Sequence, residues 1–187
     1  MECILQINRF LAGLSLGCCV ISNVSYGSII TGNNTLSING SDAFVFAYDQ
    51  ATVNLGIGSD VAFMYMHDQS HVSVTGGSLS WLHLYEQSTA AIHQTDISWL
   101  LMADNSIATV YGSDFSYSGG ILSGKWSDGT AFSFWALNFN STNYSPIFNT
   151  SSMPRNLSLH NVPTPGTLPL LVAALIPVLA FSRKLNK

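Results

Sequence analysis

The stretch "SWLHLYEQS", Ser80–Ser88, returns eighteen residues later as "SWLLMADNS", Ser98–Ser106. Both copies begin with Ser-Trp-Leu and end in an acidic residue, an amide and a serine. The acid-amide pair occurs four times, at steps of 19, 18 and 18 residues. The four pairs are Asp49-Gln50, Asp68-Gln69, Glu86-Gln87 and Asp104-Asn105. A fixed period of this length indicates a repeat architecture.

Aliphatic residues recur at fixed distances from each pair. Those before the pair are Val45/Ala47, Met64/Met66, Leu82/Leu84 and Leu100/Met102. Those after it are Val53/Leu55, Val72/Val74, Ala90/Ile92 and Ala108/Val110, and a further column is Val61, Leu79, Ile97 and Phe115. Alternation with a period of two predicts strands, and the polar corners between them are too short for crossover helices. We therefore predict an all-β fold, a parallel β-solenoid of about 18 residues per coil over residues 28–138, with its aliphatic columns inward.

The two ends of the repeat are less regular. "TLSING", Thr35–Gly40, resembles part of an incomplete first coil, and residues 115–139 resemble a degenerate last coil. The pair Asp128-Gly129 in that last coil suits a tight hairpin turn, so we predict a C-terminal cap that protects the open sheet edge. The Ser-, Asn- and Pro-rich residues 139–161 show no periodicity and are expected to be a linker.

The charge of the chain argues against a nucleic-acid partner. Only 9 % of the 187 residues are charged. Between Ser28 and Asn161 there are nine acids and two bases, a formal charge of -7. Affinity for nucleic acid depends on Lys and Arg that neutralise phosphates, and this region has too few of them.

The N-terminal residues 1–27 are typical of a secretory signal peptide. A base, Arg9, precedes an apolar run, Phe10–Ile21, which is followed by small and polar residues. The run is too short to span a bilayer. Cleavage near residues 25–27 would remove all three cysteines of the chain. A lipoprotein signal at "LGCC" is the alternative interpretation.

The C-terminal residues 162–187 combine a Pro-rich motif, a short apolar stretch and a basic tail. The motif consists of Val162, Pro163, Thr164 and Pro165, the apolar stretch is Leu168–Phe181, and the basic residues after it are Arg183 and Lys184. This end resembles the PEP-CTERM sorting signal of Gram-negative bacteria, with Thr164 where that family has Glu. The resemblance implies export, transient retention in the inner membrane with the basic end in the cytoplasm, and recognition by an exosortase that removes the tail. An ordinary C-terminal anchor is the alternative. We expect a short apolar helix at each end of the chain.

Aromatic residues alternate with the inward aliphatic residues on one strand of each coil. If they face outward, they form a strip that could bind a glycan or a partner protein; if they lie inward at a corner or beneath the C-terminal segment, they are core. The residues that define this aromatic strip are Phe63, Tyr65, Trp81, His83, Tyr85 and Trp99.

The acids of the corners should stack into a ladder. It would consist of Asp49, Asp68, Glu86 and Asp104, with Asp60, Asp96 and Asp114 as a partial second ladder. Stacked carboxylates repel one another unless a cation bridges them, which makes the first ladder a weak Ca²⁺ candidate. The simpler interpretation is that Asp and its neighbours make good corners. We expect no cofactor and no dedicated metal site, since the histidines lack metal-ligand spacing and the Ca²⁺-loop repeat is absent.

Two functional classes follow from these features. The first is an exported, non-catalytic solenoid of the cell surface or extracellular space, associated with exopolysaccharide or the cell envelope. The second is a carbohydrate-active β-helix enzyme, a polysaccharide hydrolase or lyase that uses corner acids. A lyase needs charge-stabilising bases, and a hydrolase needs two placed carboxylates in a cleft. The shortage of bases and of long loops favours the first class, with no catalytic residues.

Overall fold

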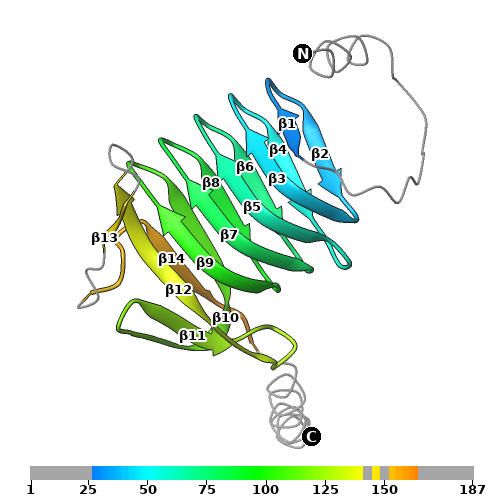
Figure 1. The fold of residues 1–187 in the computed structure, drawn as a ribbon. Helices are drawn as coiled ribbons and strands as arrows, with labels where there is room; N and C mark the ends of the chain where they lie inside the picture. The colour runs from blue at the N-terminus through cyan, green and yellow to red at the C-terminus, as the bar shows by residue number, and fades with distance from the viewer. Residues whose placement is uncertain (1–26, 141–144, 148–151, 164–187) are drawn as a thin grey trace, which may run out of the picture.

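Alternating apolar residues form strands throughout the part of the chain that the computed structural model describes, residues 27–140, 145–147 and 152–163 (Figure 1). These residues form a 14-stranded sheet and contain no helix. The strands are β1 (Ser28–Ile30), β2 (Thr35–Ile38), β3 (Ser41–Ala47), β4 (Thr52–Leu55), β5 (Asp60–Met66), β6 (His71–Val74), β7 (Ser78–Leu84), β8 (Thr89–Ile92), β9 (Asp96–Met102), β10 (Ile107–Ser118), β11 (Ile121–Lys125), β12 (Ala131–Asn140), β13 (Ser145–Ile147) and β14 (Leu157–Asn161).

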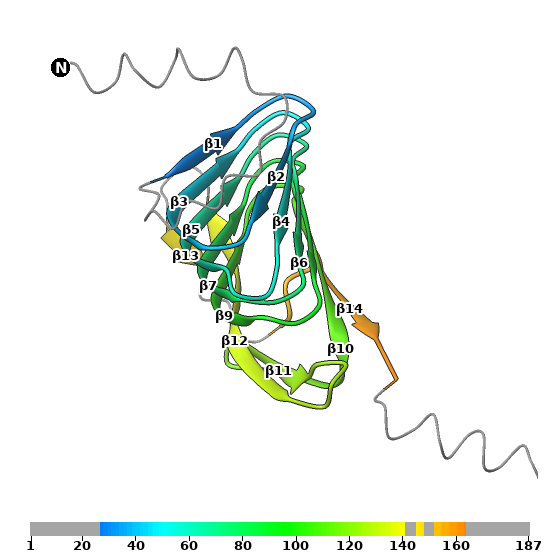
Figure 2. The same ribbon diagram turned by 90° about the vertical axis from the view of Figure 1, so that its right-hand side faces the viewer.

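The strands stack into two walls that enclose the core (Figure 2). Wall A consists of β1, β3, β5, β7, β9 and β12, and every neighbouring pair in it is parallel. Wall B consists of β2, β4, β6, β8, β10 and β14, also parallel throughout. The chain crosses each wall once per coil. The predicted parallel β-solenoid with coils of about 18 residues is confirmed; the predicted terminal helices lie outside the described residues.

The register explains the aliphatic columns. In wall A, Val45 pairs with Met64, Met64 with Leu82, and Leu82 with Leu100. In wall B, Val53 pairs with Val72, which pairs with Ala90. The predicted inward columns are buried, with 0 % exposure at all but Ala90, which is 4 % exposed. Because no coil can bury its apolar face alone, each one depends on its neighbours for its core.

The two kinds of corner differ in regularity. The corner from wall A to wall B always has four residues, 48–51, 67–70, 85–88 and 103–106. Its last residue, Ala51, Ser70, Ser88 or Ser106, is 0 % exposed, which explains why a small residue recurs there. The corner from wall B back to wall A varies in length, and Gly56–Ser59 holds the residue that makes the second step 19 rather than 18. The extra residue leaves the Ile57 side chain 90 % exposed.

The solenoid ends with an excursion of the chain. Strand β10 pairs with β8 at Ile107–Val110 but then runs straight on and pairs antiparallel with β11 over Ser113–Ser118. Strand β12 pairs antiparallel with β11 and then parallel with β9 from Trp135 onward. The predicted hairpin turn is present, with Gly129 at φ +89° and its N–H donating to the Trp126 carbonyl at 2.9 Å.

Two sequence predictions differ from this end of the structure. Phe115 does not join the column of Val61, Leu79 and Ile97, because β10 fails to turn the corner that would place it there. The predicted linker over 139–161 instead contains β13, which pairs with β12, and β14, which pairs with β10. Leu157 of β14 is 4 % exposed, since it closes the core beside Ala108.

Candidate functional site

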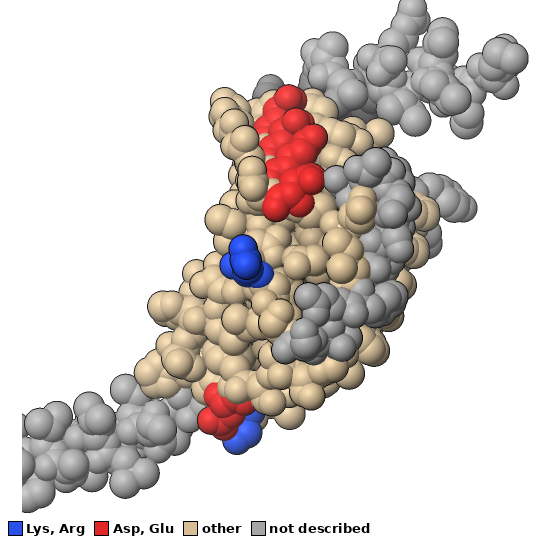
Figure 3. Space-filling view, turned by 90° about the vertical axis from the view of Figure 1, so that its left-hand side faces the viewer, with Lys and Arg blue, Asp and Glu red and all other residues tan. Residues whose placement is uncertain are grey.

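The acids of the ladder stabilise the regular corners. Asp49, Asp68, Glu86 and Asp104 each follow a wall A strand and have φ between 55° and 60°. Asp tolerates this left-handed conformation better than most residues because its short side chain can bond locally. Across each corner the chain closes a turn, as where the Ala51 N–H donates to the Tyr48 carbonyl at 3.1 Å. The aligned carboxylates form a continuous strip on one edge of the molecule (Figure 3).

Each carboxylate of the ladder accepts a backbone hydrogen bond from the preceding coil. The Asp49 N–H donates to Asp68 Oδ2 at 2.9 Å, the Asp68 N–H donates to Glu86 Oε2, and the Glu86 N–H donates to Asp104 Oδ2 at 3.2 Å. Asp49 itself accepts from the Gly32 N–H at 2.9 Å. Charge-assisted bonds to backbone N–H groups stabilise the ionised form and offset the mutual repulsion. The described residues contain no group of three or more His, Cys, Asp or Glu placed to hold a metal ion.

The aromatic strip lies on the outer face of wall A, opposite in parity to the buried columns. Its rings stack in register from coil to coil. Phe44 to Phe63 is 5.3 Å between ring centroids, Phe63 to Trp81 6.2 Å, Trp81 to Trp99 4.8 Å, and Trp99 to Trp135 5.1 Å. The interplanar angles in this column are 20° or less. Adjacent columns continue the pattern with Phe46, Tyr65 and His83, and with Tyr48, His67 and Tyr85.

Ring-on-ring stacking limits what the strip can bind. A sugar packs on the face of an aromatic ring, but here the faces contact neighbouring rings, so mainly ring edges point away from the wall. The exception is Phe44 at the first coil, which is 40 % exposed. The residue beside it is Gly27, which has no side chain to cover the ring.

The C-terminal half of the strip is buried. Tyr85 and His83 are 6 % and 9 % exposed, and Phe139 packs edge-on against both rings at 5.7 and 5.5 Å between centroids. Burial, together with the nearby His67, lowers the pKa of His83 to about 4. This part of the strip forms a second small core with Leu101, Ala103 and Leu137. It therefore contributes to stability and offers little surface to a ligand.

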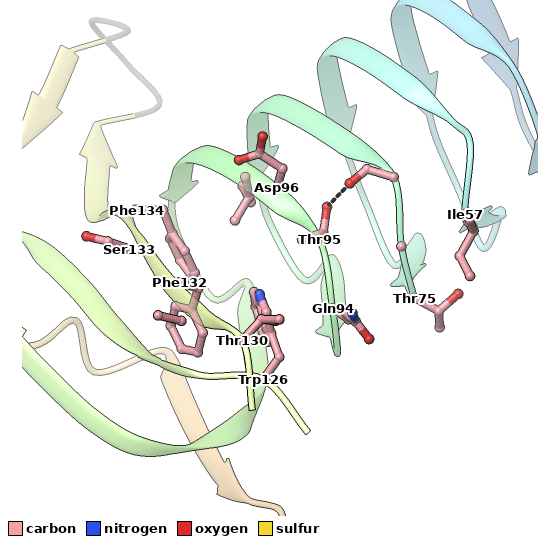
Figure 4. Close-up of a pocket in the computed structure, with 14 residues that line it drawn as sticks. Ile57, Thr75, Gln94, Thr95, Asp96, Trp126, Thr130, Phe132, Ser133 and Phe134 are labelled. Carbon is pink, nitrogen blue, oxygen red and sulfur yellow. Dashed lines mark hydrogen bonds between the residues drawn. The ribbon is translucent and has the colours of Figure 1, made fainter. Parts of the chain in front are cut away.

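The most pronounced hollow on the described surface lies at the variable corner. It has a volume of about 530 Å³, and we call it the corner groove (Figure 4). One side is built from three successive corners and the other from the β11–β12 hairpin. The lining residues are Ile57, Thr75–Gly77, Gln94–Ile97, Trp126 and Thr130–Phe134. The sequence analysis did not single out this site, because it depends on the departure of β10 from the repeat.

The sorting motif begins where the solenoid ends. The Val162 N–H donates to the Gly112 carbonyl at 2.7 Å, which extends the pairing of β14 with β10 by one residue. Val162 is half-buried and Pro163 is exposed. Thr164, Pro165, Arg183 and Lys184 lie outside the described residues. Across 27–140, 145–147 and 152–163, there is no helix long and apolar enough to cross a membrane.

Comparison with protein-family models, curated proteins and solved structures finds no match to this chain.

Proposed function

We propose that this chain is an exported, non-catalytic β-solenoid protein of a Gram-negative cell envelope, sorted through its PEP-CTERM-like C-terminal segment. The observation that carries the proposal is where the folded unit begins and ends. The first strand starts at Ser28, directly after the proposed signal peptide, and the last strand ends at Asn161, directly before the motif at Val162. Removal of both ends would therefore leave every strand of the solenoid intact.

The placement of charged groups supports a binding role over a catalytic one. The carboxylates of the ladder are engaged by backbone N–H groups, and Lys125 forms an ion pair with Asp114 at 2.8 Å. The lining of the corner groove includes one carboxylate, Asp96, whereas a glycoside hydrolase uses two. A carbohydrate-active enzyme is thus the weaker alternative.

The partners of the proposed function follow from its two stages. During sorting, an exosortase would bind the motif Val162–Pro165 while the apolar stretch Leu168–Phe181 is held in the inner membrane. After removal of the tail, the solenoid would face the extracellular side, in contact with polysaccharide or other envelope components. Its acidic and base-poor surface suits neither nucleic acid nor an anionic lipid surface.

Intact-mass measurement in a Gram-negative host, with and without an exosortase, tests this function. The expected mature chain starts near Ser28 in both strains and ends near Pro165 only when the exosortase is present. Pro163→Ala should reduce C-terminal cleavage, whereas the control Ser158→Ala, an exposed position on β14, should not. A full-length mass in both strains would contradict the proposal.

A further inference from the structure

The corner groove exists because two strands of wall A separate. Strand β9 is in register with β7 from Asp96 onward, but it comes into register with β12 only at Trp99. In the stretch before Trp99, β12 pairs instead with β11, which leads it away from the solenoid. In a parallel ladder both backbone groups of a residue point to the same neighbour. The Asp96 N–H donates to Gly77 in the preceding coil, so the backbone groups of Ile97 point toward the groove.

The rim of the groove is held in place by hydrogen bonds. The Gln94 amide donates to Asp128 Oδ2 at 2.7 Å and so joins the solenoid corner to the hairpin turn. Asp128 in turn accepts from the N–H and the hydroxyl of Thr130 at 2.9 and 2.6 Å. The Trp126 N–H closes the base of the turn by donating to the Thr130 carbonyl at 2.8 Å. A rim fixed in advance reduces the entropy that a ligand must lose on binding.

The lining supplies hydroxyl-binding groups beside apolar surface. Asp96 is exposed, and its carboxylate forms neither an ion pair nor a hydrogen bond in the described structure. The hydroxyls of Thr75 and Ser133 are also at the groove, and both residues are exposed. The exposed side chain of Ile57 forms an apolar lip. Pockets for small ligands combine apolar surface with a few placed polar groups in this way, and commonly have volumes of about 300–1,000 Å³.

The charge of the groove selects against acidic ligands. Its lining contains no Lys or Arg and one carboxylate, so a uronate or phosphate would meet repulsion without a compensating cation. A neutral, hydroxyl-rich ligand suits the lining better, because a free carboxylate can accept bonds from two neighbouring hydroxyls.

The groove is long enough for a chain rather than a single ring. A second hollow of about 330 Å³ shares Asp96, Ile97, Ser133 and Phe134 with the first and continues along the seam of β9 and β12 to Trp99 and Trp135. Both tryptophans are half-buried, at the C-terminal end of the stacked column. The path therefore runs from an apolar lip, past hydrogen-bonding groups, to aromatic edges.

We propose that the corner groove and its continuation along β9 and β12 bind a neutral oligosaccharide segment, with Asp96 accepting hydrogen bonds from sugar hydroxyls. This assignment names the ligand class of the proposed envelope protein and rests on its export to a compartment that contains such polymers.

Asp60 provides a matched control for Asp96. Both carboxylates occupy one column of wall A, in which Asp60 pairs with Ser78 and Ser78 with Asp96. Both are exposed, but Asp60 lies outside the groove. Asp96→Asn and Asp60→Asn therefore remove the same charge from the same face, and only the first alters the proposed site.

The experiment is calorimetric titration of the full chain with neutral hexasaccharides of glucan, mannan, galactan and xylan type. Uronate hexasaccharides and an extended hexapeptide are the comparison ligands. We expect at least one neutral sugar to bind, uronates to bind at least about tenfold more weakly, Asp96→Asn to weaken binding about tenfold or more, and Asp60→Asn to leave it unchanged. Equal urea midpoints for the two variants would confirm that folding is unaffected.

Three outcomes would overturn the assignment: no binding of any neutral hexasaccharide, equal losses in the two variants, or binding of the peptide in place of sugar. The test is independent of sorting, since the intact mass decides processing and the titration decides binding. A correctly processed protein that binds no neutral sugar would remove only the ligand assignment.

Discussion

The stacked column on wall A predicts a graded response to loss of single rings. Trp81 lies between Phe63 at 6.2 Å and Trp99 at 4.8 Å, the latter within 2° of parallel, and it is half-buried. An aromatic pair contributes about 0.5–1.5 kcal/mol beyond its buried area. Two lost pairs and the lost burial should make Trp81→Ala cost about 3 kcal/mol, near the lower end of the range for fully buried aromatic residues. Phe44 has one neighbour in this column, Phe63, and is 40 % exposed, so Phe44→Ala should cost about 1 kcal/mol.

Urea unfolding of the wild type and the two variants measures these losses. With a slope of about 2 kcal/mol per molar, the Trp81 variant should unfold about 1.5 M earlier and the Phe44 variant about 0.5 M earlier. Unchanged slopes would show that the folded and unfolded states keep their compactness. Losses under about 1 kcal/mol at both positions would refute the argument that stacking between coils stabilises wall A, and would return the strip to the role of a free binding surface.

Three further predictions concern the ladder, the buried histidine and the last strand. Asp68→Asn keeps an acceptor for the Asp49 N–H and suits the left-handed φ of 55°, so its urea midpoint should match or exceed that of the wild type, whereas Asp68→Ala should cost about 1–3 kcal/mol; a wild-type melting temperature that rises with millimolar Ca²⁺ would revive the metal hypothesis. Because the pKa of His83 is lowered to about 4, protons bind the unfolded chain preferentially between pH 6.5 and 4, and the wild type should lose about 3 kcal/mol as the pH falls through this range. His83→Leu, which matches Leu101 in the next coil, should flatten that dependence, and an equal slope in the variant would contradict the assignment. Leu157→Ala should weaken the docking of β14 by about 2–5 kcal/mol and speed proteolysis at Val162–Pro163, while the surface control Ser158→Ala should not.

The repeat made wall A and wall B predictable because each coil imposes the same register on the next. The columns of Met64, Leu82 and Leu100 follow directly from alternation, and so does the outward parity of Trp81. The last strand was not predicted, although "LSLH" at 157–160 resembles "LSIN" at 36–39, and the two apolar residues of each stretch have the same spacing. The intervening excursion hid that similarity, since β14 rejoins the solenoid far from its place in the period.

The same contrast explains why the corner groove escaped sequence analysis while the aromatic strip and the acid ladder did not. Residues repeated in every coil stack on copies of themselves, so their rings cover one another and their carboxylates accept backbone N–H groups of the neighbouring coil. Such columns satisfy themselves and leave few groups free for a ligand. Free groups in a concave setting arise where the translation stops, as at Asp96, where β12 has left the register of β9. In a solenoid of this kind, the positions that break the period are therefore better guides to a binding site than those that keep it.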